Sequence, residues 1–524
     1  MALLGILNIV DPASLLILLG LTLITFLIKY ILTHCQRDPR MVEFAKTLPG
    51  PRGLPLIGNS LDFHFFTGDS IKLAVEYNIK YGDTYRLWLG KYLAVTFCNI
   101  DDLETVFMNS KTLGKPKLFQ PFEDLFGDGI FITRSIAKWK KNRKCFSFVL
   151  NRKTLSRYTS IINERIEFVA NKMQDLVDGP EFDAGDYMPY LAFDIILKSA
   201  MNVDLDWNDS SFLQYFNETA EGMGICFKKV AWPWLQHETV DYLLYKNKYL
   251  KYRRKAREFL RKLIEDKKHE ILSEIEAYEN NAVASLEDVP PKRFLTLVYE
   301  LAELENNENI MLDELIMILG GGADAGLMNS FFLLMVAMHP DIQDKLYDEL
   351  YEIFGDGDRL ADENDVERLP YLDQVIRETL RRFPIPVPVM FREAGEDIKI
   401  GDRIIPANTI VLVSISAVHF NPKYYPDPWK FNPDHFSPEN VEKRPKLAFL
   451  GFSAGPRMCV GYNFGLLEMK LTLSALLRKF TFHTRMKLED VYMDNGLVLN
   501  SVNGFKLTVE SRIRKPSYLK NLKK

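Results

Sequence analysis

Residues 451–461 read GFSAGPRMCVG, and this stretch decides the fold because it sets one cysteine in a glycine-rich turn directly before a helix. From Tyr462 the sequence YNFGLLEMKLTLSALLRKF repeats apolar residues at helical spacing. Cys459 therefore precedes a helix N-terminus, whose free N–H groups and positive dipole end lower the pKa of a thiol. A lone cysteine is usually a buried structural thiol. Cys459 could be a packing residue, a redox sensor, a zinc ligand or the axial ligand of another metal, and other parts of the sequence are needed to distinguish these roles.

The composition excludes several classes of protein. With 524 residues, 47% hydrophobic and 26% charged, the chain is globular rather than disordered. A formal net charge of −4 argues against general nucleic-acid binding. No C-x-x-C or H-x-x-x-H spacing occurs, so neither a structural zinc site nor a histidine metal site is expected. The cysteines are scattered, which indicates a reducing compartment rather than a disulfide framework: Cys35, Cys98, Cys145, Cys226 and Cys459.

The N-terminal segment predicts a membrane anchor. Residues 13–32, ASLLILLGLTLITFLIKYIL, carry a single charge, Lys29. A helix rising about 1.5 Å per residue would cross the roughly 30 Å hydrocarbon core over that length. A cleaved signal peptide would have a shorter apolar region. Basic residues follow the segment and none precedes it, so we expect a retained anchor over 1–33 with the remainder of the chain in the cytosol.

The remainder is expected to form one large, mainly helical domain. Residues 34–58 hold a Pro/Gly-rich stretch that is predicted to be a stiff elbow rather than a helix. TYRLWLG and YLAVTF predict short strands early in the domain, 59–524. Long helical patterns run from Phe294 to Phe383, and short β-like pieces follow until the helix near Tyr462. No polar linker is long enough to divide this part of the chain.

Inside the opening stretch lies the pattern F-x-x-G-x-R-x-C-x-G. It resembles the haem-binding signature of cytochrome P450 enzymes, in which the cysteine thiolate is the axial iron ligand. The resemblance implies a mainly α fold with a smaller β portion, and haem b held between a long central helix and the cysteine loop. It implies that Cys459 ligates the iron and that the other motif positions help to bind the cofactor: Phe452, Gly455, Arg457 and Gly461.

Two further patterns resemble haem-carboxylate contacts of the same family. In WKKNRK, Trp139 and Arg143 stand at i, i+4, on one helical face. An indole N–H and a guanidinium are donors suited to a carboxylate. Arg392 matches a basic residue that the family uses on a haem propionate. The neighbouring lysines fit either a solvated face or a docking patch for an acidic redox partner: Lys138, Lys140, Lys141 and Lys144.

The stretch RETLRRF places Glu378 and Arg381 at i, i+3. Periodicity alone predicts a solvated pair, because the apolar residues lie on another face of the helix. The resemblance instead implies that the pair is buried and holds the segment RETLRRF in place behind the haem; we call this ion pair the lock. The family has an arginine where His435 stands, and a histidine is neutral for much of the physiological pH range. We therefore expect a softer lock in this chain.

The central helix departs from the family at one position. Gly322, Ala323 and Asp324 fit the family pattern, but Ala325 stands where a threonine is expected. In oxygen-inserting members, that threonine and the acid help to deliver protons. We also expect the glycine run 320–322 to make room for a backbone distortion or a ligand, since each glycine costs about 1 kcal/mol in a helix interior.

Over residues 49–509 the chain is most similar to the fourth-family clan of these enzymes, particularly to insect-type members. Some members of that clan attach haem covalently through a glutamate, and Gly321 replaces it, so the haem is expected to be non-covalent. The resemblance implies an apolar substrate pocket with these walls: Phe122, Phe126, Gly321, Ala325, Val387, Val389 and Val502.

The leading hypothesis is a monooxygenase of the endoplasmic reticulum membrane. It would act on a small lipophilic substrate such as a fatty acid, hormone, odorant or xenobiotic, using O2 and electrons from NADPH. The electrons would pass through a separate reductase, with cytochrome b5 as a possible second partner, because the chain has no flavin or nicotinamide fingerprint. Ala325 motivates an alternative, an NADPH-independent isomerase or dehydratase of an oxygenated lipid. A haem protein that binds lipids without turnover is a third, more remote hypothesis.

Overall fold

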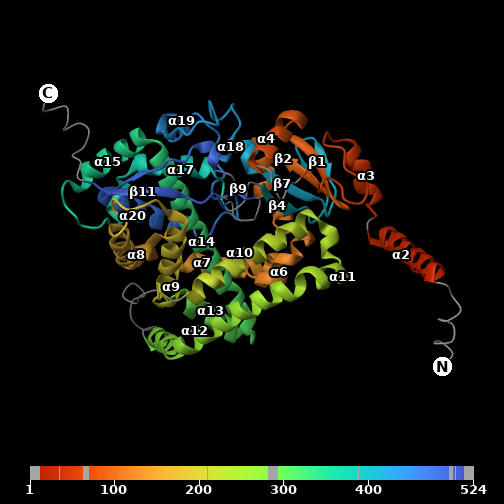
Figure 1. Ribbon diagram of the computed structural model, residues 1–524, viewed down its shortest axis with the longest axis horizontal. Helices are drawn as coiled ribbons and strands as arrows, with labels where there is room; N and C mark the ends of the chain where they lie inside the picture. The colour runs from red at the N-terminus through yellow and green to blue at the C-terminus, as the bar shows by residue number, and fades with distance from the viewer. Residues whose placement is uncertain are drawn as a thin grey trace.

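The fold is described from a computed structural model, which places residues 12–34, 36–62, 70–150, 152–208, 210–280, 293–385, 389–491, 493–494, 500–501 and 503–512. Helices make up most of the body, and a small β portion lies beside α3 and α4 (Figure 1). The helix α2 extends away from the body at the N-terminal end (Figure 1). This arrangement confirms the expected mainly helical fold with a smaller β part.

The helices of the body fall into an N-terminal and a C-terminal set. The N-terminal set comprises α3 (Pro39–Lys46), α4 (Ser70–Tyr81), α5 (Ile100–Met108), α6 (Gln120–Phe126), α7 (Ile136–Val149), α8 (Arg152–Gln174), α9 (Met188–Met201), α10 (Ser210–Ala231), α11 (Glu238–Asp241) and α12 (Asn247–Asn280). The C-terminal set comprises α13 (Phe294–Leu304), α14 (Glu308–Met338), α15 (Pro340–Phe354), α16 (Glu363–Glu367), α17 (Pro370–Arg382), α18 (Ile415–His419), α19 (Pro438–Glu442) and α20 (Tyr462–Lys479).

The strands form small, separate sheets. The largest has the order β1 (Thr84–Leu89), β2 (Tyr92–Phe97), β7 (Ile410–Ser414) and β4 (Val389–Glu393). Both strands predicted from TYRLWLG and YLAVTF are present, and only β2 and β7 pair in parallel. The other sheets are β3 (Phe182–Asp183), β11 (Lys506–Ser511) and β8 (Phe480–His483); β5 (Ile398–Ile400) and β6 (Arg403–Ile405); and β9 (Met493–Asp494) and β10 (Asn500–Ser501).

The long helix α14 crosses the middle of the molecule and is unbroken through its glycine run. Of the two roles expected for the glycine run, the helix shows no break, and the cavity beside Gly320 and Gly321 agrees with room for a ligand. A Cβ at Gly322 would lie 2.7 Å from Ile196 Cγ1, and one at Gly326 would lie 2.4 Å from the backbone of α9. Both glycines are needed because α9 approaches α14 closely. A Cβ at Gly320 or Gly321 would meet nothing within 4 Å, so these two leave open space.

The cysteine turn is folded by its own backbone. Cys459 N–H donates to Phe452 O at 3.0 Å, and Met458 N–H donates to Gly455 O at 3.0 Å. Gly455 has φ +69, and a Cβ there would lie 2.5 Å from Phe107 O, so only glycine fits this position. The helix α20 then begins at Tyr462, as the sequence predicts.

The N-terminal region differs from expectation in two ways. The first part of the predicted elbow, 34–58, contains the helix α3, because Asp38 caps it and Pro39 occupies its first turn. The Pro/Gly-rich stretch after it, 47–58, has no helix, as predicted. The predicted anchor falls on α2 (Pro12–His34). Within the placed residues, no helix combines the length and hydropathy that crossing a bilayer requires, so the transmembrane anchor over 1–33 is not supported.

Candidate functional site

A cavity of about 1450 Å³ lies between α14 and the cysteine turn. Small-molecule sites usually have about 300–1,000 Å³, so this one has room for a large cofactor and a second ligand. It brings together most of the residues that the sequence singled out. The following line it: Phe122, Phe126, Trp139, Arg143, Gly321, Gly322, Asp324, Ala325, Val389, Arg392, Phe452, Arg457, Cys459 and Gly461.

Cys459 faces this cavity from the turn before α20. Its exposure is to the cavity, since protein surrounds it on the other sides. Burial raises the pKa of the Cys459 thiol, and the backbone N–H of Gly461 opposes this only in part. Desolvation is the largest of these effects on the Cys459 pKa. The lowering expected from the helix N-terminus stays a prediction. A bound metal cation is the usual means of deprotonating such a thiol.

Three buried cations line the cavity beside the cysteine turn. Arg392 is 4% exposed and Lys115 is 7% exposed. Burial lowers the pKa of Arg392 to about 10. Burial, followed by repulsion from Arg392 and Arg143, lowers the pKa of Arg457 to about 9. Burial and the same kind of repulsion, from Arg392 and Arg457, hold the pKa of Lys115 well below its usual value.

These cations fit an anionic cofactor. Across the described ranges, no ion pair joins Lys115, Arg392 or Arg457 to a carboxylate. Arg457 donates only to backbone carbonyls, those of Leu113, Ile130 and Thr133. Buried charges are normally paired, so this cluster favours a negatively charged ligand in the cavity. The two propionates of a haem would supply it.

The predicted Trp139–Arg143 pair is also at the cavity. Trp139 is 4% exposed, and the Arg457 guanidinium lies 4.5 Å from the centre of its ring. Arg143 Nη1 donates to the carbonyl of Met458 at 2.5 Å, directly beside the cysteine. Both residues thus lie where they would contact one edge of a cofactor bound at Cys459.

The opposite wall carries Asp324. No hydrogen bond or ion pair of the placed residues involves its side chain, and burial alone raises its pKa to about 7. Its charge in turn raises the pKa of Cys459, which is consistent with the two groups facing one cavity. Ala325 lines the same wall and offers no hydroxyl. Asp324 is therefore a solitary acid on the side away from the sulfur.

The remaining predicted positions behave differently. Phe122 and Phe126 are 1% and 8% exposed and form apolar wall, and Val389 lines the cavity as well. Val387 and Val502 lie outside the described residues. Gly455 is not part of the lining, because it packs against Phe107.

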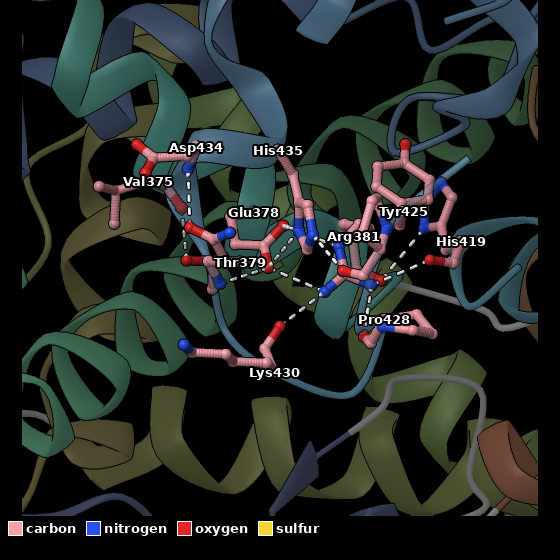
Figure 2. A network of polar contacts seen from close by, with 12 residues as sticks. Val375, Glu378, Thr379, Arg381, His419, Tyr425, Pro428, Lys430, Asp434 and His435 are labelled. Carbon is pink, nitrogen blue, oxygen red and sulfur yellow. Dashed lines mark hydrogen bonds and ion pairs between the residues drawn. The ribbon is translucent and has the colours of Figure 1, made fainter. Parts of the chain in front are cut away.

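The pair that periodicity placed in solvent, Glu378 and Arg381, is fully buried at 0% exposure. Figure 2 shows the carboxylate held between Arg381 and His435. Arg381 Nε and Nη2 donate to Glu378 at 2.7 and 2.8 Å. Its other donors reach backbone carbonyls: His419 at 2.9 Å, Pro428 at 2.8 Å and Lys430 at 3.2 Å. Every guanidinium donor is used, which is what makes burial of this charge possible.

His435 completes the network. Its Nδ1 lies 3.2 Å from both oxygens of Glu378, and its Nε2 lies 2.7 Å from the Pro426 carbonyl. Both partners are acceptors, so the doubly protonated ring satisfies both contacts. Burial raises the pKa of Glu378, but the hydrogen bonds from Arg381 and His435 outweigh burial and lower it overall. His435 therefore takes over part of the role of the family's arginine.

The softer lock remains a prediction, and His435→Arg tests it. Arginine would give Glu378 the permanently charged partner that the family has at this place. We expect His435→Arg to exceed the wild type in unfolding free energy by about 1 kcal/mol. Urea unfolding of the two proteins measures this. Equal stability of the two proteins would contradict it.

A second buried carboxyl, Glu468 of α20, also lines the cavity. It is 1% exposed and accepts hydrogen bonds from Asn329 of α14 at 3.1 Å and from Thr472 at 3.2 Å. Its Oε2 and Asn329 Oδ1 are both buried without a partner. Burial raises the pKa of Glu468 to about 7. A proton on Oε2 would give Glu468 a donor for an acceptor such as Asn329 Oδ1.

Glu468→Gln should stabilise the protein at pH 8. The folded-state pKa of about 7 exceeds the unfolded value of 4.5, so the native state binds the extra proton and loses stability as pH rises from 4.5 to 7. At 1.36 kcal/mol per unit the penalty is about 3 kcal/mol. Glutamine is neutral and can donate to Asn329 Oδ1. We expect the variant to exceed the wild type by about 2–3 kcal/mol at pH 8 and to match it near pH 4.5. Equal stability at both values would contradict an ionised Glu468.

Two site residues escaped the sequence analysis. Lys115 sits in GKPK, which has the composition of a surface turn, and only its burial shows that it faces the cofactor space. Glu468 stands between apolar residues of YNFGLLEMKLTLSALLRKF, where a charged residue is normally expected to face solvent. No local signal marks either residue, because burial of a charged side chain depends on segments far away in the sequence.

Comparison with known proteins agrees with this geometry. The profile of the family described as Cytochrome P450 matches residues 48–509. Cytochrome P450 4g1 of Drosophila melanogaster is 30% identical, with 91% of each chain covered. Cytochrome P450 4c21 of Blattella germanica is 29% identical over 95% of this chain and 99% of its own. Cytochrome P450 4V2 of Homo sapiens is 28% identical over 95% of this chain and 96% of its own.

Proposed function

The chain belongs to the cytochrome P450 family, in its fourth family, and from that premise we propose that it inserts one oxygen atom from O2 into a small lipophilic substrate. Membership implies monooxygenase chemistry, a haem with a cysteine thiolate ligand, and electrons supplied by a reductase. The observation that carries the proposal is the cavity itself, with Cys459 on one wall and unpaired buried cations beside it.

In this proposal Cys459 ligates the iron, while Arg392, Arg457 and Trp139 hold the propionates with help from Arg143 and Lys115. The haem, when bound, supplies the oxygen chemistry. Pairing with propionates would remove the repulsion among these cations. The Glu378 network anchors α17 through Arg381 to backbone carbonyls beyond the helix.

Asp324 is proposed to handle protons. A carboxyl with a pKa of about 7 is divided between its two forms near neutral pH, which suits a group that takes up and releases a proton at its carboxylate oxygen. Ala325 cannot share this task. Apolar walls around Phe122, Phe126 and Val389 limit water on the substrate side. The absence of a side chain at Gly321 supports non-covalent binding of haem b.

The proposed substrate class is a fatty acid, hormone, odorant or xenobiotic, since apolar side chains dominate the walls. NADPH–cytochrome P450 reductase, with cytochrome b5 as a second donor, would dock at the basic face of α7. Lys138 and Lys141 of that face pair with Asp128 and Glu305, respectively. Lys140 and Lys144 are exposed and are the residues that we assign to docking.

We propose an endoplasmic reticulum location, with the domain 59–524 in the cytosol and the apolar helix α2 in contact with the membrane. Apolar side chains of α2, from Leu16 to Ile24, are 53–69% exposed. Leu56, Trp234 and Leu243 are exposed apolar side chains as well. Leu56 and Pro233, in the 3₁₀ helix η4 (Pro233–Gln236), both approach Gly90. Figure 1 places α2 and α11 toward the same end of the molecule.

Flotation with neutral lipid vesicles tests this location. The full chain should float with the vesicles, and a chain that begins at residue 36 should bind at least about tenfold more weakly, because burying the apolar face of α2 drives association. Equal flotation of both chains would contradict a membrane role for α2.

A second candidate, an isomerase or dehydratase of an oxygenated lipid, is favoured by one observation, the missing hydroxyl at Ala325. Anaerobic incubation of the haem-loaded protein with lipid hydroperoxides, without NADPH or reductase, separates the two. A monooxygenase should leave the hydroperoxides without catalytic rearrangement. Multiple turnovers under these conditions would favour the second candidate.

A further inference from the structure

The loop 127–133 joins α6 to α7 and forms one wall of the cavity. Ile130, Phe131 and Ile132 line it. The loop has no helix or strand of its own. Its position, and with it the shape of the pocket, therefore depends on individual contacts.

Two adjacent carboxyls of α14 hold the loop from one side. Asp128 N–H donates to Asp313 Oδ2 at 2.9 Å, and Ile130 N–H donates to Glu314 Oε2 at 3.1 Å. Asp313 and Glu314 are 4% and 1% exposed. The loop is not part of a helix or sheet, so the two N–H groups have no regular backbone acceptor, and the two carboxylates accept their hydrogen bonds instead.

The glycines of the loop show how tight this contact is. At Gly127, which has φ +86, a Cβ would lie 2.0 Å from Asp313 Oδ1. At Gly129 a Cβ would lie 2.9 Å from the carbonyl of Asp313. Only a chain without side chains at these positions can approach α14 so closely.

Arg457 holds the loop from the other side. Its Nη1 donates to Ile130 O and its Nη2 to Thr133 O, both at 3.3 Å. The residue Ile130 thus has its N–H on Glu314 and its carbonyl on Arg457. The loop spans the distance between the central helix and the cation cluster that the proposed function assigns to the cofactor.

We propose that Glu314, with Asp313 beside it, is a positioning residue that sets the shape of the substrate pocket by fixing loop 127–133. The inference rests on the proposed function, because the pocket matters only if a haem is bound at Cys459. It predicts that ligands large enough to reach the loop depend on Glu314, and that ligands confined to the iron do not.

The charge environment gives the proposal a pH signature. Burial raises the pKa of Glu314 to about 7. From α7, Asn142 donates to Glu314, Cys145 lies near it, and Lys138 pairs with Asp128 of the loop. Arg257 of α12 pairs with the neighbouring Asp313. Arg457 donates to the Ile130 carbonyl from the other side of the loop. At pH 8 the carboxylate offers two acceptors, to Ile130 N–H and to Asn142. At pH 6 the protonated acid loses one of them, so the loop is held less firmly.

The test uses the haem-loaded full chain and two probes that bind haem iron, imidazole and 4-phenylimidazole, read as shifts of the main haem absorption band. Glu314→Leu should raise the dissociation constant of 4-phenylimidazole at least about fivefold, as expected for a pocket wall that is no longer preorganised. Imidazole should stay within about twofold, because it does not reach the wall. Glu308→Leu is the matched control: Glu308 is on the same helix, half exposed, and pairs with Arg261.

A second measurement does not depend on the folding of Glu314→Leu. Glu314→Gln should match the wild type for 4-phenylimidazole at pH 6, where both side chains are neutral. At pH 8 the wild type should bind about threefold more tightly than Glu314→Gln, because only the carboxylate offers two acceptors.

Identical 4-phenylimidazole binding by the wild type and Glu314→Gln at both pH values would overturn the proposal. So would equal weakening of both probes in Glu314→Leu, which would mean general damage to the haem site. A wild type that takes up no haem would overturn this inference together with the proposed function. Normal haem uptake and imidazole binding, together with unchanged 4-phenylimidazole binding by Glu314→Leu, would overturn this inference alone.

Discussion

Replacing Cys459 with serine should reduce NADPH-dependent product formation at least about a thousand-fold, a loss of about 4 kcal/mol of transition-state stabilisation. A hydroxyl does not provide the electron donation of a thiolate to the iron. Because Arg392, Arg457, Trp139 and Lys115 would still surround the cofactor, we expect haem to remain bound with an altered spectrum.

Cys145→Ser is the matched control for this prediction. Cys145 is a half-buried free thiol of α7 that does not line the cavity. It should leave both the spectrum and the turnover within about twofold of the wild type. An unchanged spectrum in Cys459→Ser would contradict the assignment of Cys459 as the iron ligand.

Replacing Arg381 with alanine should be the most destabilising single change considered for this chain. Removing one partner of a fully buried ion pair leaves the Glu378 carboxylate uncompensated, at a cost of about 3–5 kcal/mol. The carbonyls of His419, Pro428 and Lys430 lose their donor at the same time. We expect loss of the haem-loaded fold at 37 °C, measured as haem retention and as urea unfolding.

Two control variants are compared with Arg381→Ala in unfolding free energy. Arg261→Ala removes an ion pair to Glu308 in which both side chains are about half exposed, and it should change the unfolding free energy by less than about 1 kcal/mol. Arg381→Lys keeps the charge but loses the planar fork, so it should fall between the two. Equal stability of Arg381→Ala and Arg261→Ala would contradict a structural role for the buried network.

The sequence predicted the fold where its information is local. The cysteine turn, the helix after it, the two early strands and the long central helices all follow from residue spacing and turn chemistry. Asp324, Arg392 and Trp139 reach the same cavity because the family pattern carries their placement. Family motifs of this kind indicate contacts between residues far apart in the sequence, which the periodicity of apolar residues does not predict.

The failures have a common physical cause, which is the burial of charge. Periodicity alone placed Glu378 and Arg381 in water, because it assumes that charged residues face solvent. The pair is buried, as the family resemblance implied, and its hydrogen bonds are met internally. Lys115 and Glu314 were missed because their partners lie on distant segments.

We propose that this cavity performs NADPH-dependent oxygen insertion even though Ala325 replaces the usual hydroxyl. One experiment tests this: the purified chain is combined with a matched reductase, NADPH and ¹⁸O-labelled dioxygen over a mixed extract of lipids and odorants, and the products are read by mass spectrometry. The expected products carry one labelled oxygen atom and form only when NADPH is present. Unlabelled products that form without NADPH would contradict it.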